Sequence, residues 1–228
     1  MKRSEVNEAL IWAKQLFANS RIALPPFGYW TLDEWQGKKD QIATICQTML
    51  GWDITDYGMG DFKSIGSVLF TLRNGDQKNP GIGTPYAEKL IPLYEGQRLP
   101  CHFHYTKTED IIVRAGGAMY IQLYRALPET MDVDVNSPVE VYMDGIRKTF
   151  EAGQTVLLHP GQSITLTPYL YHTFGAQKGY GDVVIGEVSS INDDNTDNHF
   201  SEPVSRFSAI EEDQPVLHPL CNEYGKIL

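Results

Sequence analysis

Two histidines and a glutamate stand close together in the segment LPCHFHYTKTE, residues 99–109. His102 and His104 are two residues apart, and Glu109 follows five residues after His104. In a β-strand, side chains two residues apart project from the same face, so both imidazoles are expected to face one way. An antiparallel hairpin could bring the carboxylate back to them. Two imidazoles and a carboxylate suit Mn, Fe, Co, Ni or Zn better than Ca or Mg.

A fourth metal ligand has to come from elsewhere in the chain. His172, in the segment PYLYHTF, is the strongest candidate because it ends a later strand-like run. His159, His199 and His218 lack such neighbours, and we interpret them as surface or structural residues. The alternative for the closely spaced pair is that both rings are partly buried and hydrogen-bonded without any metal.

The composition excludes several classes of protein. The chain has 228 residues, of which 42% are hydrophobic and 21% charged, as in ordinary globular proteins with a buried core. A formal net charge of -10 argues against nucleic acid or an anionic membrane as partner. No apolar run is long enough to span a bilayer. Three scattered cysteines without a CxxC pair favour a reduced, cytoplasmic protein.

The first part of the chain has helical patterns. The segment SEVNEALIWAKQLFANS carries apolar residues at helical spacing, and Ser4 is expected to cap its first turn. Thr31 and Glu34 have the spacing of a capping box, which predicts a second helix running on to Leu50. Residues 1–65 are therefore predicted to be mostly helical.

Short β-rich runs separated by turn residues follow from residue 66 onward. Gly116-Gly117 and Asp144-Gly145 separate adjacent runs in the way that hairpin turns do. Strands at this spacing predict a mainly β fold, a barrel or sandwich over residues 66–190, with the helices packed on it. An irregular C-terminal segment, 191–228, follows. No linker divides the chain, so a single domain over 1–228 is expected.

The spacing around the two histidines matches the first motif of the cupin superfamily. The matching residues are Gly96, His102, His104, Glu109 and Gly116. The second cupin motif is matched less closely. Pro168 stands one residue nearer to His172 than that motif requires, and Leu170 replaces its glycine. The fourth ligand is therefore less strongly indicated than the first three.

The whole chain resembles the D-lyxose isomerase family of cupins. The resemblance is carried by the helical N-terminus and by PPFGYW, HFHYTKTEDIIVRAGG, PYLYHTFGA and GEVSSINDDNTDNHF. It implies a cupin barrel, a double-stranded β-helix of jelly-roll type. It also implies a homodimeric, metal-dependent aldose–ketose isomerase that interconverts D-lyxose with D-xylulose and D-mannose with D-fructose. The implied cofactor is a divalent metal, most often Mn²⁺, with Co²⁺, Fe²⁺ or Zn²⁺ as alternatives.

An aldose–ketose isomerisation needs a base near C1 and C2 that is not itself a metal ligand. Glu187 shares one face of a predicted strand with Val183 and Ile185, which suggests a carboxylate lining the barrel; a solvated strand-end glutamate is the alternative. Glu202, in NHFSEP, lies in a segment that could fold over the barrel mouth. From its neighbours alone Glu202 is a solvated loop charge, but the resemblance places the base in this late segment. Glu202 is therefore the first candidate and Glu187 the second.

Further polar residues are candidates for binding the sugar. Lys107 lies next to the predicted metal ligands, where a cation could stabilise an oxyanion on O1 or O2; the alternative is an exposed turn lysine. The segment NDDNTDN supplies Asp193, Asp194 and Asp197, which could hold sugar hydroxyls or form a solvated turn. Lys107, Glu187 and Asp194 are the predicted substrate-binding residues. Aromatic residues of PPFGYW could wall the pocket, although such clusters more often pack in a core.

Three alternative functions remain open at this point. A metal-dependent cupin dioxygenase has similar ligands but usually an apolar pocket, whereas Lys107 and Glu187 favour a polyol. A sugar-phosphate isomerase needs a cationic cluster, and Arg98, Arg114 and Arg125 do not form an evident one. A non-catalytic sugar-binding cupin often lacks the metal ligands, which are intact in the first motif here. A small free sugar is thus the expected partner.

Overall fold

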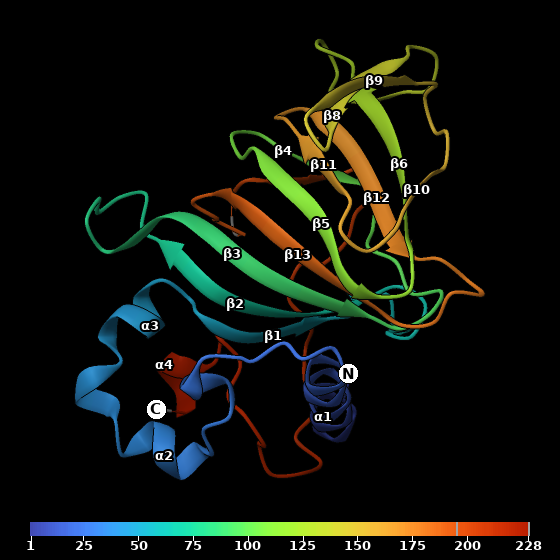
Figure 1. Ribbon diagram of the computed structural model, residues 1–228. Helices are drawn as coiled ribbons and strands as arrows, with labels where there is room; N and C mark the ends of the chain where they lie inside the picture. Colours follow the sequence, from blue (N-terminus) through green and yellow to red (C-terminus); the bar gives the residue numbers. More distant parts are fainter. Residues whose placement is uncertain (195, 228) are drawn as a thin grey trace.

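Two antiparallel sheets curl toward each other in the computed structural model, which describes residues 1–194 and 196–227 (Figure 1). The first sheet consists, in spatial order, of β1 (Gly51–Thr55), β2 (Ser67–Gly75), β3 (Gly83–Leu93), β13 (Val183–Ser190), β5 (Glu109–Gly116), β11 (Ser163–Leu166), β8 (Val139–Met143) and β9 (Ile146–Phe150). The second consists of β10 (Val156–Leu158), β6 (Met119–Ala126), β12 (Leu170–Ala176), β4 (His102–His104) and β14 (Asn198–Phe200), with β7 (Val133–Asp134) paired to β6.

The space between the sheets is filled by apolar side chains, which alternate with less buried residues along strands such as β5 and β6. Along β5, for example, Ile111 and Val113 are buried while the residues between them are half-buried. Leu93, Ile121 and Phe174 contribute to the same core from other strands. This period of two is what a sheet with one buried face requires. The predicted cupin barrel is confirmed.

Helices cover the outer face of the β1–β2–β3 side of the barrel (Figure 1). They are α1 (Arg3–Asn19), α2 (Leu32–Gln36), α3 (Ala43–Gln47) and α4 (Tyr224–Ile227), with short 3₁₀ turns at Pro26–Gly28 and Lys39–Gln41. Leu10 and Phe17 of α1 pack in a second core with Trp52 and Phe70 of the sheet. In the described residues, no helix is long and apolar enough to cross a membrane.

The N-terminal part differs in detail from the prediction. Helix α1 begins at Arg3 with Lys2 as its N-cap, so Ser4 is not the cap; its hydroxyl instead donates to Asp213 of the C-terminal segment at 2.7 Å. The capping box of Thr31 is confirmed, because its hydroxyl accepts from the backbone N–H of Glu34 at 3.3 Å.

The predicted second helix is broken and is followed by a strand that sequence patterns did not indicate. Helix α2 ends at Gln36, since the next residues include a glycine and only polar side chains before Ile42. Strand β1 then lies within the segment predicted to be helical. Its Trp52 packs toward the helices, while Asp53 faces the inside of the barrel.

One of the two predicted hairpin turns is correct and one is wrong. Asp144 and Gly145 both have positive φ, 50° and 78°, and join the paired strands β8 and β9 as a two-residue turn. Gly116-Gly117 instead carries the chain from one sheet to the other, because β5 and β6 do not pair. A Cβ on Gly116 would lie 2.3 Å from the carbonyl oxygen of Asp182, so glycine is required at this corner.

The C-terminal segment returns to the helices and is held there by polar contacts. The buried guanidinium of Arg3 pairs with Glu212 at 2.6 Å and with Glu223. His218, 3% exposed, has Nδ1 2.8 Å from the carbonyl oxygen of Trp30 and Nε2 2.7 Å from Nζ of Lys14. This pattern fits a neutral imidazole, and burial lowers the pKa of His218.

We therefore expect His218 to make folding sensitive to mild acid. The unfolded chain takes up a proton at this residue near pH 6.5, whereas the folded chain does so only at lower pH. The contribution of His218 to the free energy of unfolding is thus fully present above pH 6.5 and decreases as the pH falls below that value. Between pH 7.5 and 5.5, the free energy of unfolding should fall less in His218→Gln than in the wild type. Urea unfolding at both pH values measures this.

The matched control is His159→Gln, since His159 is exposed. It should keep the pH dependence of the wild type. An unchanged pH dependence in His218→Gln would show that His218 does not contribute.

Candidate active site

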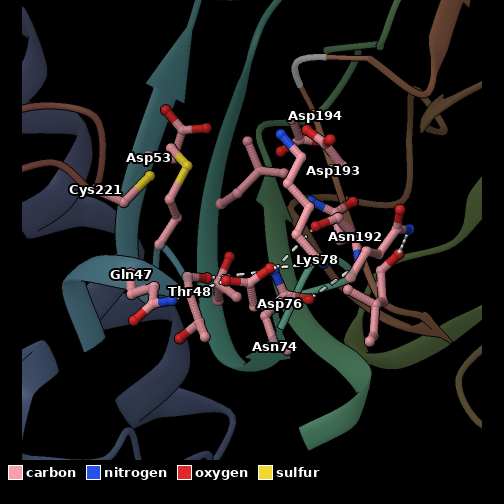
Figure 2. Close-up of a pocket in the computed structure, with 16 residues that line it drawn as sticks. Gln47, Thr48, Asp53, Asn74, Asp76, Lys78, Asn192, Asp193, Asp194 and Cys221 are labelled. Carbon is pink, nitrogen blue, oxygen red and sulfur yellow. Dashed lines mark hydrogen bonds between the residues drawn. The ribbon is translucent and has the colours of Figure 1, made fainter. Parts of the chain in front are cut away.

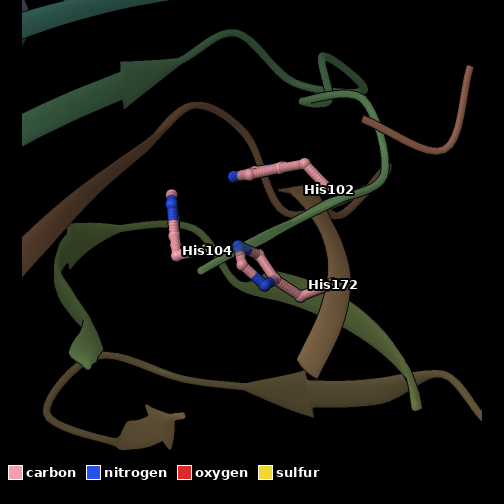
Figure 3. A group of neighbouring side chains, drawn as sticks. All are labelled: His102, His104 and His172. Atoms are coloured by element: carbon pink, nitrogen blue, oxygen red, sulfur yellow. The ribbon is translucent and has the colours of Figure 1, made fainter. Parts of the chain in front are cut away.

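Three imidazoles gather inside the barrel from two neighbouring strands (Figure 3). His102 and His104 both point inward from β4, and Phe103 between them points outward against His199. His172, near the start of β12 and not at its end, is paired in register with His102. One ring nitrogen from each histidine lies within 4.8 Å of the others. Strand alternation and register thus bring the three rings together.

Backbone carbonyls orient two of these rings. Nδ1 of His102 lies 2.8 Å from the carbonyl oxygen of Pro100, and Nδ1 of His172 lies 3.0 Å from that of Leu170. An N–H at Nδ1 donates to each carbonyl and leaves the lone pair of Nε2 directed into the barrel, the usual arrangement of metal-binding histidines.

The imidazoles of His102 and His172 are neutral, and one of them has an unpaired nitrogen. Burial, together with the neighbouring imidazoles, holds the pKa of His102 well below its ordinary value. Burial lowers the pKa of His172 to about 4. Nε2 of His172 is buried and has no hydrogen-bond partner among the described residues. Buried polar atoms without a partner are rare, and a metal ion would satisfy this one.

Glu109 faces the three imidazoles from the opposite sheet. Its Oε1 lies 3.3 Å from Nε2 of His104 and 3.2 Å from Nε2 of His172, and the residue is 2% exposed. The predicted hairpin between the histidines and Glu109 does not form, because β4 and β5 belong to different sheets. The carboxylate faces the imidazoles across the barrel. Three imidazole nitrogens and one carboxylate oxygen fit a divalent transition metal better than Ca²⁺ or Mg²⁺.

Lys107 links Glu109 to a second buried carboxylate. Its Nζ lies 2.7 Å from Oε2 of Glu109 and 2.9 Å from Oε1 of Glu187. Lys107 is 3% exposed, so it is not a solvated turn lysine. Burial lowers the pKa of Lys107, but the two carboxylates raise it by more. Burial raises the pKa of Glu187, but Lys107 and Lys89 outweigh burial and lower it, so this carboxylate is ionised at neutral pH.

Lys89 was not singled out from the sequence. It is the register partner of Glu187 on β3, and its Nζ lies 3.2 Å from Oε1 of Glu187 and 2.7 Å from Oδ1 of Asn192. A signal was present, because Lys89 shares an inward face with Ile91 and Leu93, as Glu187 does with its own apolar neighbours. Lys89 on β3 and Glu187 on β13 thus share one sequence pattern, an ionic residue on an otherwise apolar strand face.

Arg206 extends this series of buried ion pairs and was not indicated by the sequence patterns. Its Nη2 lies 2.8 Å from Oδ2 of Asp194 and 2.6 Å from Oδ2 of Asp53. Nη1 is buried and has no hydrogen-bond partner among the described residues. Asp194 is also 3.7 Å from Nζ of Lys89, and Arg206 and Lys89 overcome burial to hold its pKa well below the ordinary value. Arg206 comes from an irregular segment, where no periodicity signals an inward side chain.

Asp197, another residue of the predicted polar loop, has a structural role. Its carboxylate accepts the backbone N–H groups of Thr106 at 2.8 Å and Lys107 at 3.1 Å. It therefore fixes the turn that carries Lys107.

Glu202 lies away from these groups, against the prediction, and the aromatic residues of PPFGYW lie in the core, as was expected to be more common. Glu202 is exposed and is not among the residues that line the cavity at the imidazoles. Strand β14 ends at Phe200, whose ring is 5.4 Å from that of His102, and the inward alternation does not continue to Glu202. Phe27 and Trp30 of PPFGYW pack against Trp35 in the helical layer, so they form core rather than a pocket wall.

The cavity at these residues, here called the chamber, measures about 40 Å³. It is lined by the three imidazoles, the carboxylates of Glu109, Glu187 and Asp194, and the cations Lys89, Lys107 and Arg206. Apolar side chains such as Leu99 and Phe174 close its remaining sides. The chamber thus combines a metal-ligand group, an ionised carboxylate that is not needed as a ligand, and adjacent ammonium groups.

Comparison with known sequences identifies the family. A family model described as D-lyxose isomerase matches residues 1–224. The chain belongs to the D-lyxose isomerase family. It is 45% identical to the D-lyxose/D-mannose isomerase of Serratia proteamaculans, with both chains fully covered. It is 43% identical to the D-lyxose/D-mannose isomerase of Escherichia coli O157:H7, with 98% of each covered. The predicted enzyme class, a sugar isomerase, is confirmed by this membership.

Solved structures of L-ribose isomerases share the fold. The ligand-free enzyme of Cellulomonas parahominis superposes with a TM-score of 0.59 at 18% identity, covering 92% of this chain and 98% of that one. The Acinetobacter sp. DL28 enzyme in complex with L-ribose gives 0.57 at 17% identity with the same coverage. At this identity the likeness concerns the fold alone.

The ligand group predicts how metal binding responds to substitution. His172→Gln removes the nitrogen that lacks a partner and should weaken Mn²⁺ binding by at least about tenfold. His159→Gln, a change of the same kind at an exposed position, should leave binding unchanged. Titration of chelator-treated protein with Mn²⁺, followed by electron paramagnetic resonance of the free ion, measures both. Equal affinities in the two variants would contradict the assignment of His172.

Proposed function

We propose that the protein interconverts D-lyxose with D-xylulose, and D-mannose with D-fructose, using a divalent metal ion, with Mn²⁺ as the first choice. The observation that carries this proposal is the ionised carboxylate of Glu187, held by two lysines beside the ligand group. The relatives named for D-lyxose and D-mannose support the choice of substrates. A homodimer and a cytoplasmic location remain predictions made from the sequence.

We assign the metal to His102, His104, His172 and Glu109, whose ligand atoms converge in the chamber. A divalent ion bound there supplies a Lewis acid that polarises the carbonyl of the open-chain sugar.

Glu187 is the proposed base and replaces Glu202 as first candidate. Its carboxylate is buried, ionised and separated from the ligand group by the ammonium of Lys107. It can therefore accept the proton from C2 and return it to C1 without being withdrawn from a metal, while the hydroxyl proton of O2 moves to O1 so that the carbonyl forms at C2. The side chain of Glu202 is exposed and is not part of the chamber lining, so Glu187 is the better placed of the two carboxylates.

Lys107 is proposed to stabilise the enediolate. In the resting site its ammonium is shared by Glu109 and Glu187. When Glu187 takes up the proton from C2, its charge disappears and a negative charge develops on the sugar oxygen. The ammonium of Lys107 can then attract that oxygen in place of Glu187. The number of negative charges around the ammonium therefore stays constant during the step.

The charges of the chamber favour an uncharged sugar. Lys107, Lys89 and Arg206 each lie within 3.2 Å of at least one carboxylate oxygen. A phosphate would have to compete with these carboxylates for every cation, which disfavours a sugar phosphate. The ionic lining equally disfavours the apolar substrates of cupin dioxygenases.

Conversion of D-lyxose by chelator-treated protein, with and without Mn²⁺, tests the proposal. Formation of D-xylulose only after metal is restored is the expected result. If folded protein that binds Mn²⁺ formed no ketose from either D-lyxose or D-mannose, the proposed function would be wrong.

The assignment of the base predicts opposite outcomes for two matched variants. Glu187→Gln should lower kcat by roughly 10²–10⁴-fold, since a general base contributes that much. Mn²⁺ affinity should stay within about threefold of the wild type, because Glu187 is not a proposed ligand. Glu202→Gln, the same change at the exposed glutamate, should leave kcat unchanged. Steady-state kinetics with D-lyxose distinguishes them, and a loss confined to Glu202→Gln would reverse the assignment.

A further inference from the structure

A second and larger cavity, here called the vestibule, lies beside the chamber. It measures about 270 Å³. Figure 2 shows it between β1 and β2 on one side and the segment Asn192–Asp194 on the other, with the turn at Asp76–Lys78 below. Leu69 and Asp194 line both cavities, so the two share a wall. The sequence patterns and the proposed reaction leave the vestibule without a role.

The chamber alone has too little space for a sugar. A cavity needs roughly 10–15 Å³ to admit one water molecule, so about 40 Å³ admits only a few groups of that size. The carbonyl end of an open-chain sugar fills this space. The remaining carbons and their hydroxyls have to lie outside the chamber, and the vestibule is the larger cavity that adjoins it.

A row of register partners runs from the proposed base to the vestibule. On the concave face of the first sheet, Glu187 is paired with Lys89, and Lys89 is paired with Thr71 of β2. Neighbouring strands are about 4.8 Å apart, so Thr71 lies about 10 Å from the base along the sheet. This is the scale of an extended six-carbon chain that starts at the base.

The polar groups of the vestibule suit sugar hydroxyls. Thr71 is 7% exposed and lines the cavity, and its hydroxyl has no hydrogen-bond partner among the described residues. Thr48, Asn74 and Asn192 also line this cavity. Their side chains are already hydrogen-bonded within the protein, so Thr71 is the lining residue on which the argument rests. An almost buried hydroxyl that is directed into a cavity and lacks a partner points to a ligand with hydroxyl groups.

We propose that the vestibule is the subsite for the end of the sugar remote from the carbonyl, and that Thr71 sets the length of aldose accepted. The inference rests on the proposed function and deepens it. The last carbon of a hexose reaches farther into the vestibule than that of a pentose. A larger side chain at Thr71 should therefore weaken the binding of hexoses more than that of pentoses.

The test compares binding of two unreactive alditols, those obtained by reducing D-lyxose and D-mannose. They carry the same hydroxyl tails but no carbonyl, so binding is read without any reaction. In Mn²⁺-loaded protein, Thr71→Met should weaken binding of the six-carbon alditol at least about tenfold, because overpacking a filled site costs this much. Binding of the five-carbon alditol should weaken about threefold or less. Isothermal titration calorimetry measures both.

A second variant and a control separate this effect from damage to the fold. Ile191→Trp fills the vestibule from the opposite wall and should give the same preference for the shorter alditol. Thr149→Met makes the same change as Thr71→Met at an exposed position on β9 and should alter neither affinity. Thermal unfolding confirms that each variant is folded.

Equal weakening of both alditols, no weakening, or no binding of either alditol to the wild type would overturn the proposal. Isomerisation of D-lyxose by the wild type reports separately on the proposed function. A protein that isomerises D-lyxose but shows equal effects on both alditols loses only the vestibule proposal. A protein that forms no ketose but discriminates between the alditols loses only the reaction.

Discussion

Burial of the Glu109 carboxylate is the constraint on which the rest of the site depends. An unpaired carboxylate that is 2% exposed would cost several kcal/mol, so cations have to surround it. Lys107 is one of them, and the three imidazoles provide the nitrogens for another. Because Lys107 is itself buried, it requires a second carboxylate, Glu187, which in turn is contacted by Lys89. This series of alternating positive and negative side chains ends at Arg206. Its ion pair with Asp53 connects the irregular C-terminal segment to the barrel.

The charge count of this network suits a neutral substrate that becomes an anion. Four carboxylates face three cations; they are Glu109, Glu187, Asp194 and Asp53 against Lys107, Lys89 and Arg206. The difference is one negative charge. A divalent ion at the imidazoles would change the total to one positive charge, and because Glu187 loses its charge when it takes the proton from C2, the protein groups then carry two positive charges facing the single negative charge of the enediolate. A sugar that arrives uncharged and gains one negative charge in the transition state therefore gains the most from this site.

Local patterns in the sequence predicted the parts of the site that depend on one strand. The inward direction of His102 and His104 follows from the period of two, and the mainly β fold follows from the same pattern along the chain. Features that depend on contacts between distant parts of the chain could not be predicted from these patterns. Gly116-Gly117 resembles a hairpin turn, and only the pairing of the whole sheets makes it a corner between them. Lys89 carried a readable signal, whereas Arg206 reaches the site from a segment without regular spacing.

Turnover of D-lyxose in D₂O tests whether a buried carboxylate moves a proton between two carbon atoms of the sugar. A carboxylate that holds the C2 proton exchanges part of it with solvent before returning it to C1. The account therefore predicts that the D-xylulose formed carries deuterium at C1, detectable by nuclear magnetic resonance. Product without any deuterium at C1 would show that the hydrogen does not exchange with solvent on its way from C2 to C1, as in a direct hydride transfer, and would contradict the expected role of Glu187.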